Sequence, residues 1–160
     1  MKKLKYTHYN IVFQEVPNET TLVFNISGCP YKCEGCHSTY LWEYKGKFLL
    51  ENINEILSNY KNFITCVCFM GGDQNSLELY NLLRICQEFG LKTCLYTGKD
   101  FNSLEEIYAL PYFNYLNFIK VGHYDKNLGG LNNPKTNQRF YKIEYGRLID
   151  ITETFQKKYY

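Results

Sequence analysis

Residues 63–72, FITCVCFMGG, form an apolar and β-branched run that ends in two glycines. A run of this length without polar alternation is typical of a strand that is buried on both faces, as the strands of parallel sheets are. Helical periodicity of apolar residues precedes this run over 52–63 and follows it over 76–90. A buried strand between two helices predicts a βαβ unit with parallel strands.

The alternation of strands and helices extends toward both ends of the chain. Further elements are expected as a hairpin or two adjacent strands at 9–16 and 20–27, a strand at 91–98, a helix at 103–110, a strand at 115–122 and two short strands within 141–152. This order predicts an α/β fold with a mostly parallel sheet. A closed eight-stranded barrel typically needs ~250 residues. We therefore expect the 160 residues to form one domain, 1–160, built as an open partial (β/α) barrel.

Composition excludes several classes of function. Hydrophobic residues make up 45% of the chain and charged residues 21%, which are the proportions of a soluble globular protein. The net charge of +2 is too small to indicate binding to nucleic acid or to a membrane surface. No apolar segment reaches the roughly 18–20 residues of a membrane helix, and no signal peptide follows the basic start MKKLK. We therefore expect a cytoplasmic protein.

The seven cysteines fall into two groups. An odd number of cysteines without an export signal argues against a disulfide framework and favours thiolate ligands for a metal. Four lie within strand or helix patterns and are expected to pack in the core as small apolar side chains: Cys66, Cys68, Cys86 and Cys94. The other three lie in the loop GCPYKCEGCH, residues 28–37, which follows a predicted strand: Cys29, Cys33 and Cys36.

Three cysteines in one loop leave three kinds of metal site to consider. A structural zinc site needs four ligands, and the sequence shows no second pair of the right kind. The segment CEGCH at 33–37 matches the haem c attachment pattern, with His37 as axial ligand, but this leaves Cys29 unexplained and expects export. A four-iron cluster normally takes four thiolates. Three would leave one iron without a protein ligand, which is the open position of a catalytic metal site.

Glycine-containing segments follow four of the predicted strands, at 27–29, 70–73, 96–98 and 120–124. In open α/β sheets, ligands bind outside the carboxyl ends of the strands. Since these four segments belong to one edge of such a sheet, they predict a single binding site there, next to the cysteine loop.

The spacing C-x3-C-x2-C after a strand, together with MGGD at 70–73, resembles the radical S-adenosylmethionine superfamily. The resemblance implies the open partial barrel of that superfamily and a [4Fe-4S] cluster held by Cys29, Cys33 and Cys36. It also implies that S-adenosylmethionine chelates the open iron. Its methionine amino group would be bound by Gly71, Gly72 and Asp73, although Asp73 replaces the usual glutamate and Gln74 the usual proline.

The resemblance suggests further contacts with S-adenosylmethionine. His37 follows the third cysteine, where the superfamily packs against adenine, although a plain loop histidine is an equal alternative. Thr97 and Gly98 end a predicted strand and would contact the ribose or the carboxylate. Lys120 would pair with the methionine carboxylate, its alternative being a solvated lysine. Tyr31, between two cysteines, is a candidate for shielding the cluster from solvent.

Four segments are similar to the small activating proteins of anaerobic (class III) ribonucleotide reductases: NISGCPYKCEGCHS at 25–38, FMGGDQ at 69–74, LYTG at 95–98 and GGLNNPKTNQRFYK at 129–142. The resemblance implies an enzyme that generates a glycyl radical on the large subunit of anaerobic ribonucleoside-triphosphate reductase, with flavodoxin as electron donor. The loop 124–140 is the candidate for partner contact or for closing over the cofactor.

Alternatives remain open within the sequence. The same radical chemistry would serve an activase of another glycyl radical enzyme, such as pyruvate formate-lyase, or an enzyme acting on a small modified-nucleoside precursor. A non-catalytic iron–sulfur carrier or zinc-stabilised interaction module is the third reading, although an electron carrier would be expected to have four cysteine ligands.

Overall fold

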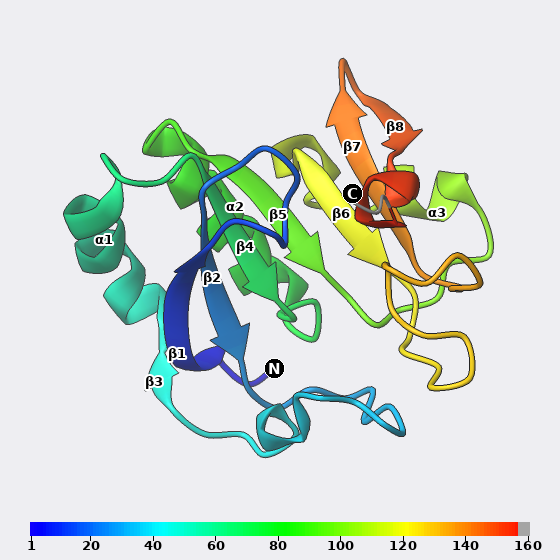
Figure 1. The fold of residues 1–160 in the computed structure, drawn as a ribbon. Coiled ribbons are helices and arrows are strands. Elements are labelled where there is room, and N and C mark those ends of the chain that lie inside the picture. Colours follow the sequence, from blue (N-terminus) through cyan, green and yellow to red (C-terminus); the bar gives the residue numbers. More distant parts are fainter. Residues whose placement is uncertain (157–160) are drawn as a thin grey trace.

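A computed structural model describes residues 1–156 of the chain (Figure 1). Its eight strands form one sheet in the order β3-β1-β2-β4-β5-β6-β7-β8. The strands are β1 (Lys5–Val12), β2 (Thr21–Ile26), β3 (Lys47–Phe48), β4 (Cys66–Met70), β5 (Lys92–Tyr96), β6 (Phe118–Val121), β7 (Arg139–Glu144) and β8 (Arg147–Asp150). The helices are α1 (Leu49–Tyr60), α2 (Ser76–Glu88) and α3 (Leu104–Tyr108), with 3-10 turns η1 (Thr39–Leu41), η2 (Phe113–Tyr115) and η3 (Thr152–Gln156).

The mixed α/β class is confirmed, but the prediction of a mostly parallel sheet is wrong. Only the four central strands β2, β4, β5 and β6 run parallel to one another. The flanking pairs are antiparallel, namely β1 with β2 and β3, and β7 with β6 and β8. The short turn 145–146 joins the antiparallel strands β7 and β8, whereas parallel strands need a crossover. The helices α1, α2 and α3 supply such crossovers in the centre alone.

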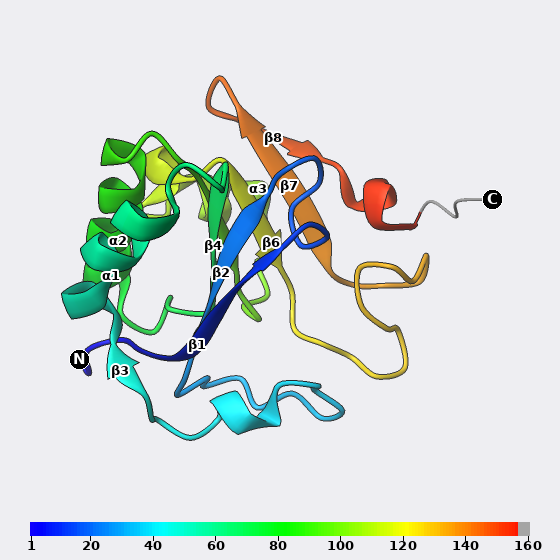
Figure 2. The same cartoon turned by 60° about the vertical axis from the view of Figure 1, so that its left-hand side comes forward.

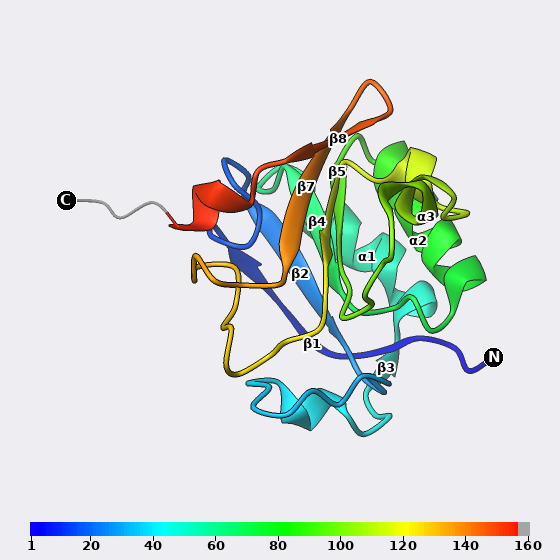
Figure 3. The same ribbon diagram turned by 90° about the vertical axis from the view of Figure 1, so that its right-hand side faces the viewer.

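The helices lie on one face of the sheet, and loops cover much of the other (Figures 2 and 3). On the helical face, α1 presents Ile53, Ile56 and Leu57 at helical spacing, and these side chains enter the larger core. On the opposite face, Val16 from the β1–β2 loop and Phe155 from η3 pack over the strands in a second, smaller core. No helix among residues 1–156 is long and apolar enough to span a bilayer.

The four cysteines predicted to lie in the core are confirmed there. Cys66, Cys68, Cys86 and Cys94 are all fully buried and unbridged. Successive side chains of a strand point to opposite faces. Cys66 and Cys68 of β4 therefore join Cys94 of β5 in the smaller core, while Val67 and Phe69 face the helices. Burial raises the pKa of the Cys66, Cys86 and Cys94 thiols well above the usual value, so these thiols stay protonated.

Replacement of Phe69 by alanine tests the helical core. Phe69 is fully buried and stacks on Phe24, with the ring centroids 5.8 Å apart. Removing a buried aromatic ring leaves a cavity, so we expect Phe69→Ala to lower the free energy of unfolding by about 3–5 kcal/mol. Urea denaturation followed by circular dichroism measures the change.

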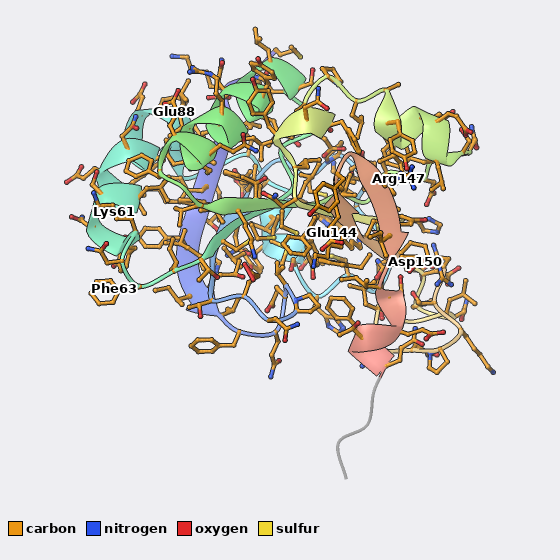
Figure 4. The ribbon with its side chains drawn as sticks, turned by 90° about the horizontal axis from the view of Figure 1, so that it is seen from above. Lys61, Phe63, Glu88, Glu144, Arg147 and Asp150 are labelled. Carbon is orange, nitrogen blue, oxygen red and sulfur yellow. The ribbon has the colours of Figure 1, made fainter. Side chains whose placement is uncertain are left out.

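The matched control is Phe63→Ala. Phe63 is 70% exposed and lies at the periphery of the molecule (Figure 4). Its truncation should change the free energy of unfolding by no more than about 0.5 kcal/mol. Equal effects of the two substitutions would contradict the placement of the core between β4 and the helices.

Candidate functional site

The carboxyl ends of the four parallel strands β2, β4, β5 and β6 point to the same edge of the sheet, toward the cysteine loop (Figure 1). A cavity of about 340 Å³ lies at this edge. Its lining includes Cys29, Cys33, Cys36, Asp73, Thr97 and Lys120, which come from four separate segments. The structure thus brings the cysteine loop and three strand ends around one space.

Two residues with positive φ and two backbone hydrogen bonds shape the cysteine loop. Lys32 and Gly35 have positive φ angles of 45° and 79°, a left-handed conformation that lets the chain turn tightly between the cysteines. The Cys36 amide donates to the Cys33 carbonyl at 3.1 Å, and the Cys29 amide donates to the Leu41 carbonyl at 2.9 Å. In contrast to the four core cysteines, the three loop cysteines are only partly buried.

The three thiols of this loop are the kind of donor that iron–sulfur clusters take. Within residues 1–156, no three metal-ligating side chains converge on one ion position. A four-iron cluster does not require such convergence, because each thiolate binds a different iron atom. Three thiols of one loop at an open cavity therefore suit a [4Fe-4S] cluster with one iron that has no protein ligand.

Asp73 joins the cysteine loop to two strand ends. Its Oδ2 accepts a hydrogen bond from the Tyr31 hydroxyl and another from the Thr97 hydroxyl, both at 2.7 Å. Burial, and to a lesser extent the contact with Asp73, raise the pKa of Tyr31, so the phenol remains a donor. Oδ1 of Asp73 is buried and has no hydrogen-bond partner in the described part of the chain. This oxygen is therefore an acceptor that no described residue satisfies.

The two glycines before Asp73 have different surroundings. Both have a positive φ, 98° at Gly71 and 111° at Gly72. Gly71 lines the cavity, whereas Gly72 is buried against Ile26 and donates its amide hydrogen to Gln74 Oε1 at 3.0 Å. The structure therefore does not place Gly72 in the cavity. Gln74, the residue in place of the usual proline, lines it instead.

Lys120 lies inside the site. It is 9% exposed, and its Nζ donates to the carbonyl oxygens of Gly122 at 2.9 Å and Thr97 at 3.2 Å. Burial lowers its pKa to about 8. The alternative of a solvated lysine is wrong.

His37 lies outside the cavity. Its side chain is exposed, and its ring centroid is 5.9 Å from that of Tyr124. The structure thus does not bring His37 together with the other predicted site residues.

Sequence reasoning did not identify Trp42 as part of the site. It follows η1, six residues after the last loop cysteine, and lines the cavity with the three loop cysteines. It is the single tryptophan of the chain, which is the one sequence signal that distinguishes it.

A second groove of about 570 Å³ runs along the other side of the cysteine loop. The loop 124–140 borders it, and Lys126 from this loop pairs with Glu34 of the cysteine loop at 2.6 Å. His123 pairs with Asp100 at 2.8 Å across the same groove. The start of the long loop therefore lies directly against the cysteine loop.

Comparison with known proteins agrees with this donor set. The family described as "4Fe-4S single cluster domain" matches residues 19–141, which includes all three loop cysteines and the four central strands. The anaerobic ribonucleoside-triphosphate reductase-activating protein of Enterobacteria phage T4 is 33% identical over 116 residues, which cover 67% of this chain and 72% of the phage protein. The chain belongs to the family of these reductase-activating proteins, with a domain of the single-cluster 4Fe-4S type.

Proposed function

We propose that this protein is a radical S-adenosylmethionine activase that generates a glycyl radical on the large subunit of anaerobic ribonucleoside-triphosphate reductase. The observation that carries the proposal is the shared cavity of the three loop cysteines and Asp73, whose Oδ1 has no partner within residues 1–156. A three-thiolate cluster has one open iron, and a zwitterionic ligand needs an acceptor such as Asp73 beside it. The likeness to the phage T4 activating protein supports the choice of partner.

Cys29, Cys33 and Cys36 would hold the [4Fe-4S] cluster. When bound and reduced, the cluster would supply the electron for the cleavage of S-adenosylmethionine on which hydrogen abstraction from the target glycine depends. The tasks of the protein are then to bind the cofactor, to orient it and to exclude water and oxidants.

Thr97 supports both charged groups that would receive the methionine moiety. Its hydroxyl donates to Asp73, and its carbonyl accepts from the Lys120 ammonium. Asp73 would accept from the amino group of the cofactor, and Lys120 would pair with its carboxylate. Because Thr97 contacts both residues, it fixes the Asp73 carboxylate, at the end of β4, relative to the Lys120 ammonium, at the end of β6.

The face of the sheet opposite the helices is open to a macromolecular substrate. This open face supports the proposal that the fold is an open partial barrel of the radical S-adenosylmethionine type. A groove of about 690 Å³ on the face opposite the helices shares Met70 and Tyr96 with the cofactor cavity. It leads outward past Phe13, which is 71% exposed, and Leu131. An extended loop of the reductase would reach the radical by this route, beside the 124–140 loop.

We place the reaction in the cytoplasm, with a low-potential carrier such as flavodoxin as electron donor. All seven cysteines are free thiols in the structure, which is the state that a reducing compartment maintains.

Anaerobic reconstitution tests the proposal. The protein loaded with iron and sulfide, then reduced, is expected to release methionine and 5′-deoxyadenosine from S-adenosylmethionine, measured by chromatography. Addition of the large reductase subunit should then give the doublet of a glycyl radical in the electron paramagnetic resonance spectrum. Tightly bound zinc without iron would contradict the radical chemistry. A doublet with pyruvate formate-lyase but not with the reductase would contradict the choice of partner.

Asp73→Asn tests the acceptor for the cofactor. The amide keeps the size of the side chain but removes its charge and one acceptor oxygen. A charge-assisted hydrogen bond is worth about 1.5–3 kcal/mol, so we expect the Kd for S-adenosylmethionine to rise by roughly 10–100-fold. Anaerobic calorimetry on the cluster-loaded protein measures it, with Glu144→Gln on the exposed β7–β8 hairpin as control (Figure 4). The same Kd in both variants would mean that Asp73 does not bind the cofactor.

Lys120→Met tests the cation at the end of β6. Methionine fills a similar volume and fits a buried site without a charge. We expect weaker binding of S-adenosylmethionine, by roughly 10-fold or more, with unchanged iron content. Lys61→Met, at the exposed end of α1, should leave the Kd unaltered (Figure 4). Wild-type affinity in Lys120→Met would assign the carboxylate to another partner.

A further inference from the structure

The position of Trp42 beside the first loop cysteine is fixed by the backbone. The Cys29 amide donates to the carbonyl oxygen of Leu41, the residue immediately before Trp42, at 2.9 Å. Leu41 is buried, at 6% exposure, and both Leu41 and Trp42 line the cavity of about 340 Å³ that contains the cysteines. The indole therefore belongs to the wall of the space in which the cluster would be held.

The indole N–H of Trp42 is an unsatisfied donor. Its Nε1 is buried and has no acceptor among residues 1–156. A buried donor without a partner is destabilising, and buried tryptophan N–H groups usually find a partner. Since Trp42 lines the cavity that the three loop cysteines share, a group bound to those cysteines is the nearest candidate for the missing partner.

The segment that carries Trp42 already donates to a cysteine sulfur. The Ser38 amide donates to Cys36 Sγ at 3.3 Å, four residues before the tryptophan. Residues 38–42 thus offer one N–H group to a thiol of the loop and carry a second, unpaired N–H group on Trp42, a residue that lines the same cavity. N–H groups around an iron–sulfur cluster hydrogen-bond to its sulfur atoms, and these bonds help to set its reduction potential.

We propose that Trp42 donates its indole N–H to a sulfur atom of the cluster bound at Cys29, Cys33 and Cys36, and that this hydrogen bond raises the reduction potential. The sulfur atoms carry more negative charge in the reduced state, so a donor stabilises that state more than the oxidised one. Trp42 is then a positioning and tuning residue for the cluster. The inference rests on the binding of the cluster and is independent of whether S-adenosylmethionine is the cosubstrate.

The bond is detected directly in the unmodified protein, because the chain contains one tryptophan. Ultraviolet resonance Raman spectra contain an indole band that reports hydrogen bonding of the N–H group. We expect this band to indicate a free N–H in the metal-free protein and a bonded N–H once the cluster is assembled, before any S-adenosylmethionine is added. A shift that occurs only on addition of S-adenosylmethionine, or no shift, would overturn the proposal.

Trp42→Phe tests the effect on the cluster. Phenylalanine keeps an aromatic side chain in the wall and removes the N–H. Spectroelectrochemical titration without S-adenosylmethionine is expected to give a more negative potential than in the wild type. Tyr40→Phe is the matched control, since it removes a polar hydrogen from the same segment at a side chain that is 43% exposed. It should leave the potential unchanged.

The outcomes separate this proposal from the proposed function. Cluster-loaded Trp42→Phe with the wild-type potential would refute the tuning role, whatever the protein does with S-adenosylmethionine. If Trp42→Phe fails to take up iron, the Raman band of the wild-type protein decides, and an unshifted band would make Trp42 a structural residue. Conversely, a shifted band and potential in a protein that does not cleave S-adenosylmethionine would uphold this inference and refute the proposed function.

Discussion

The partly buried carboxylate of Asp73 holds the cysteine loop against the ends of the central strands. A carboxylate taken out of water needs hydrogen bonds to offset the loss of hydration. Here the Tyr31 hydroxyl comes from the loop and the Thr97 hydroxyl from the end of β5, so one oxygen atom joins three segments. The ring of Tyr31 can approach because residue 98 is glycine, where an added Cβ would lie 3.0 Å from Tyr31 Cγ.

The sheet topology makes this arrangement possible. The four parallel strands end at the same edge, which brings Asp73, Thr97 and Lys120 from three neighbouring strands to one cavity. The antiparallel strands at both ends of the sheet widen it without adding predicted ligands. The helices cover one face of the sheet (Figure 3). The other face keeps a groove that shares the lining residues Met70 and Tyr96 with the cavity.

Elements could be predicted from the sequence where their pattern lies within one run of consecutive residues. The strand at 63–72 and the helix at 76–90 were predicted because apolar periodicity is a property of consecutive residues, and the structure confirms them as β4 and α2. The hairpin reading of 9–16 and 20–27 agrees with the antiparallel pair β1–β2. The antiparallel pairing of β7 with β6 was missed, because it joins strands separated by a long loop. The two-residue strand β3 is too short to leave any pattern.

The site was predictable in part for the same reason. Motif spacing placed the loop cysteines and Asp73 at one edge, since strand ends follow from strand assignments. The direction of a side chain does not follow from spacing. His37 is adjacent to Cys36 yet lies outside the cavity, while Trp42, which no motif marks, forms part of its wall.

The two groups of cysteines have a consequence for how the protein acquires its metal. Thiolate is the form that attacks electrophiles and binds iron. The core thiols of Cys66, Cys86 and Cys94 are inaccessible and protonated over the physiological range, so they do not compete for incoming iron or sulfide. Assembly is thereby directed to the partly exposed loop. A chain with seven cysteines can then assemble its cluster at the loop alone, because its buried core thiols do not take up iron or sulfide.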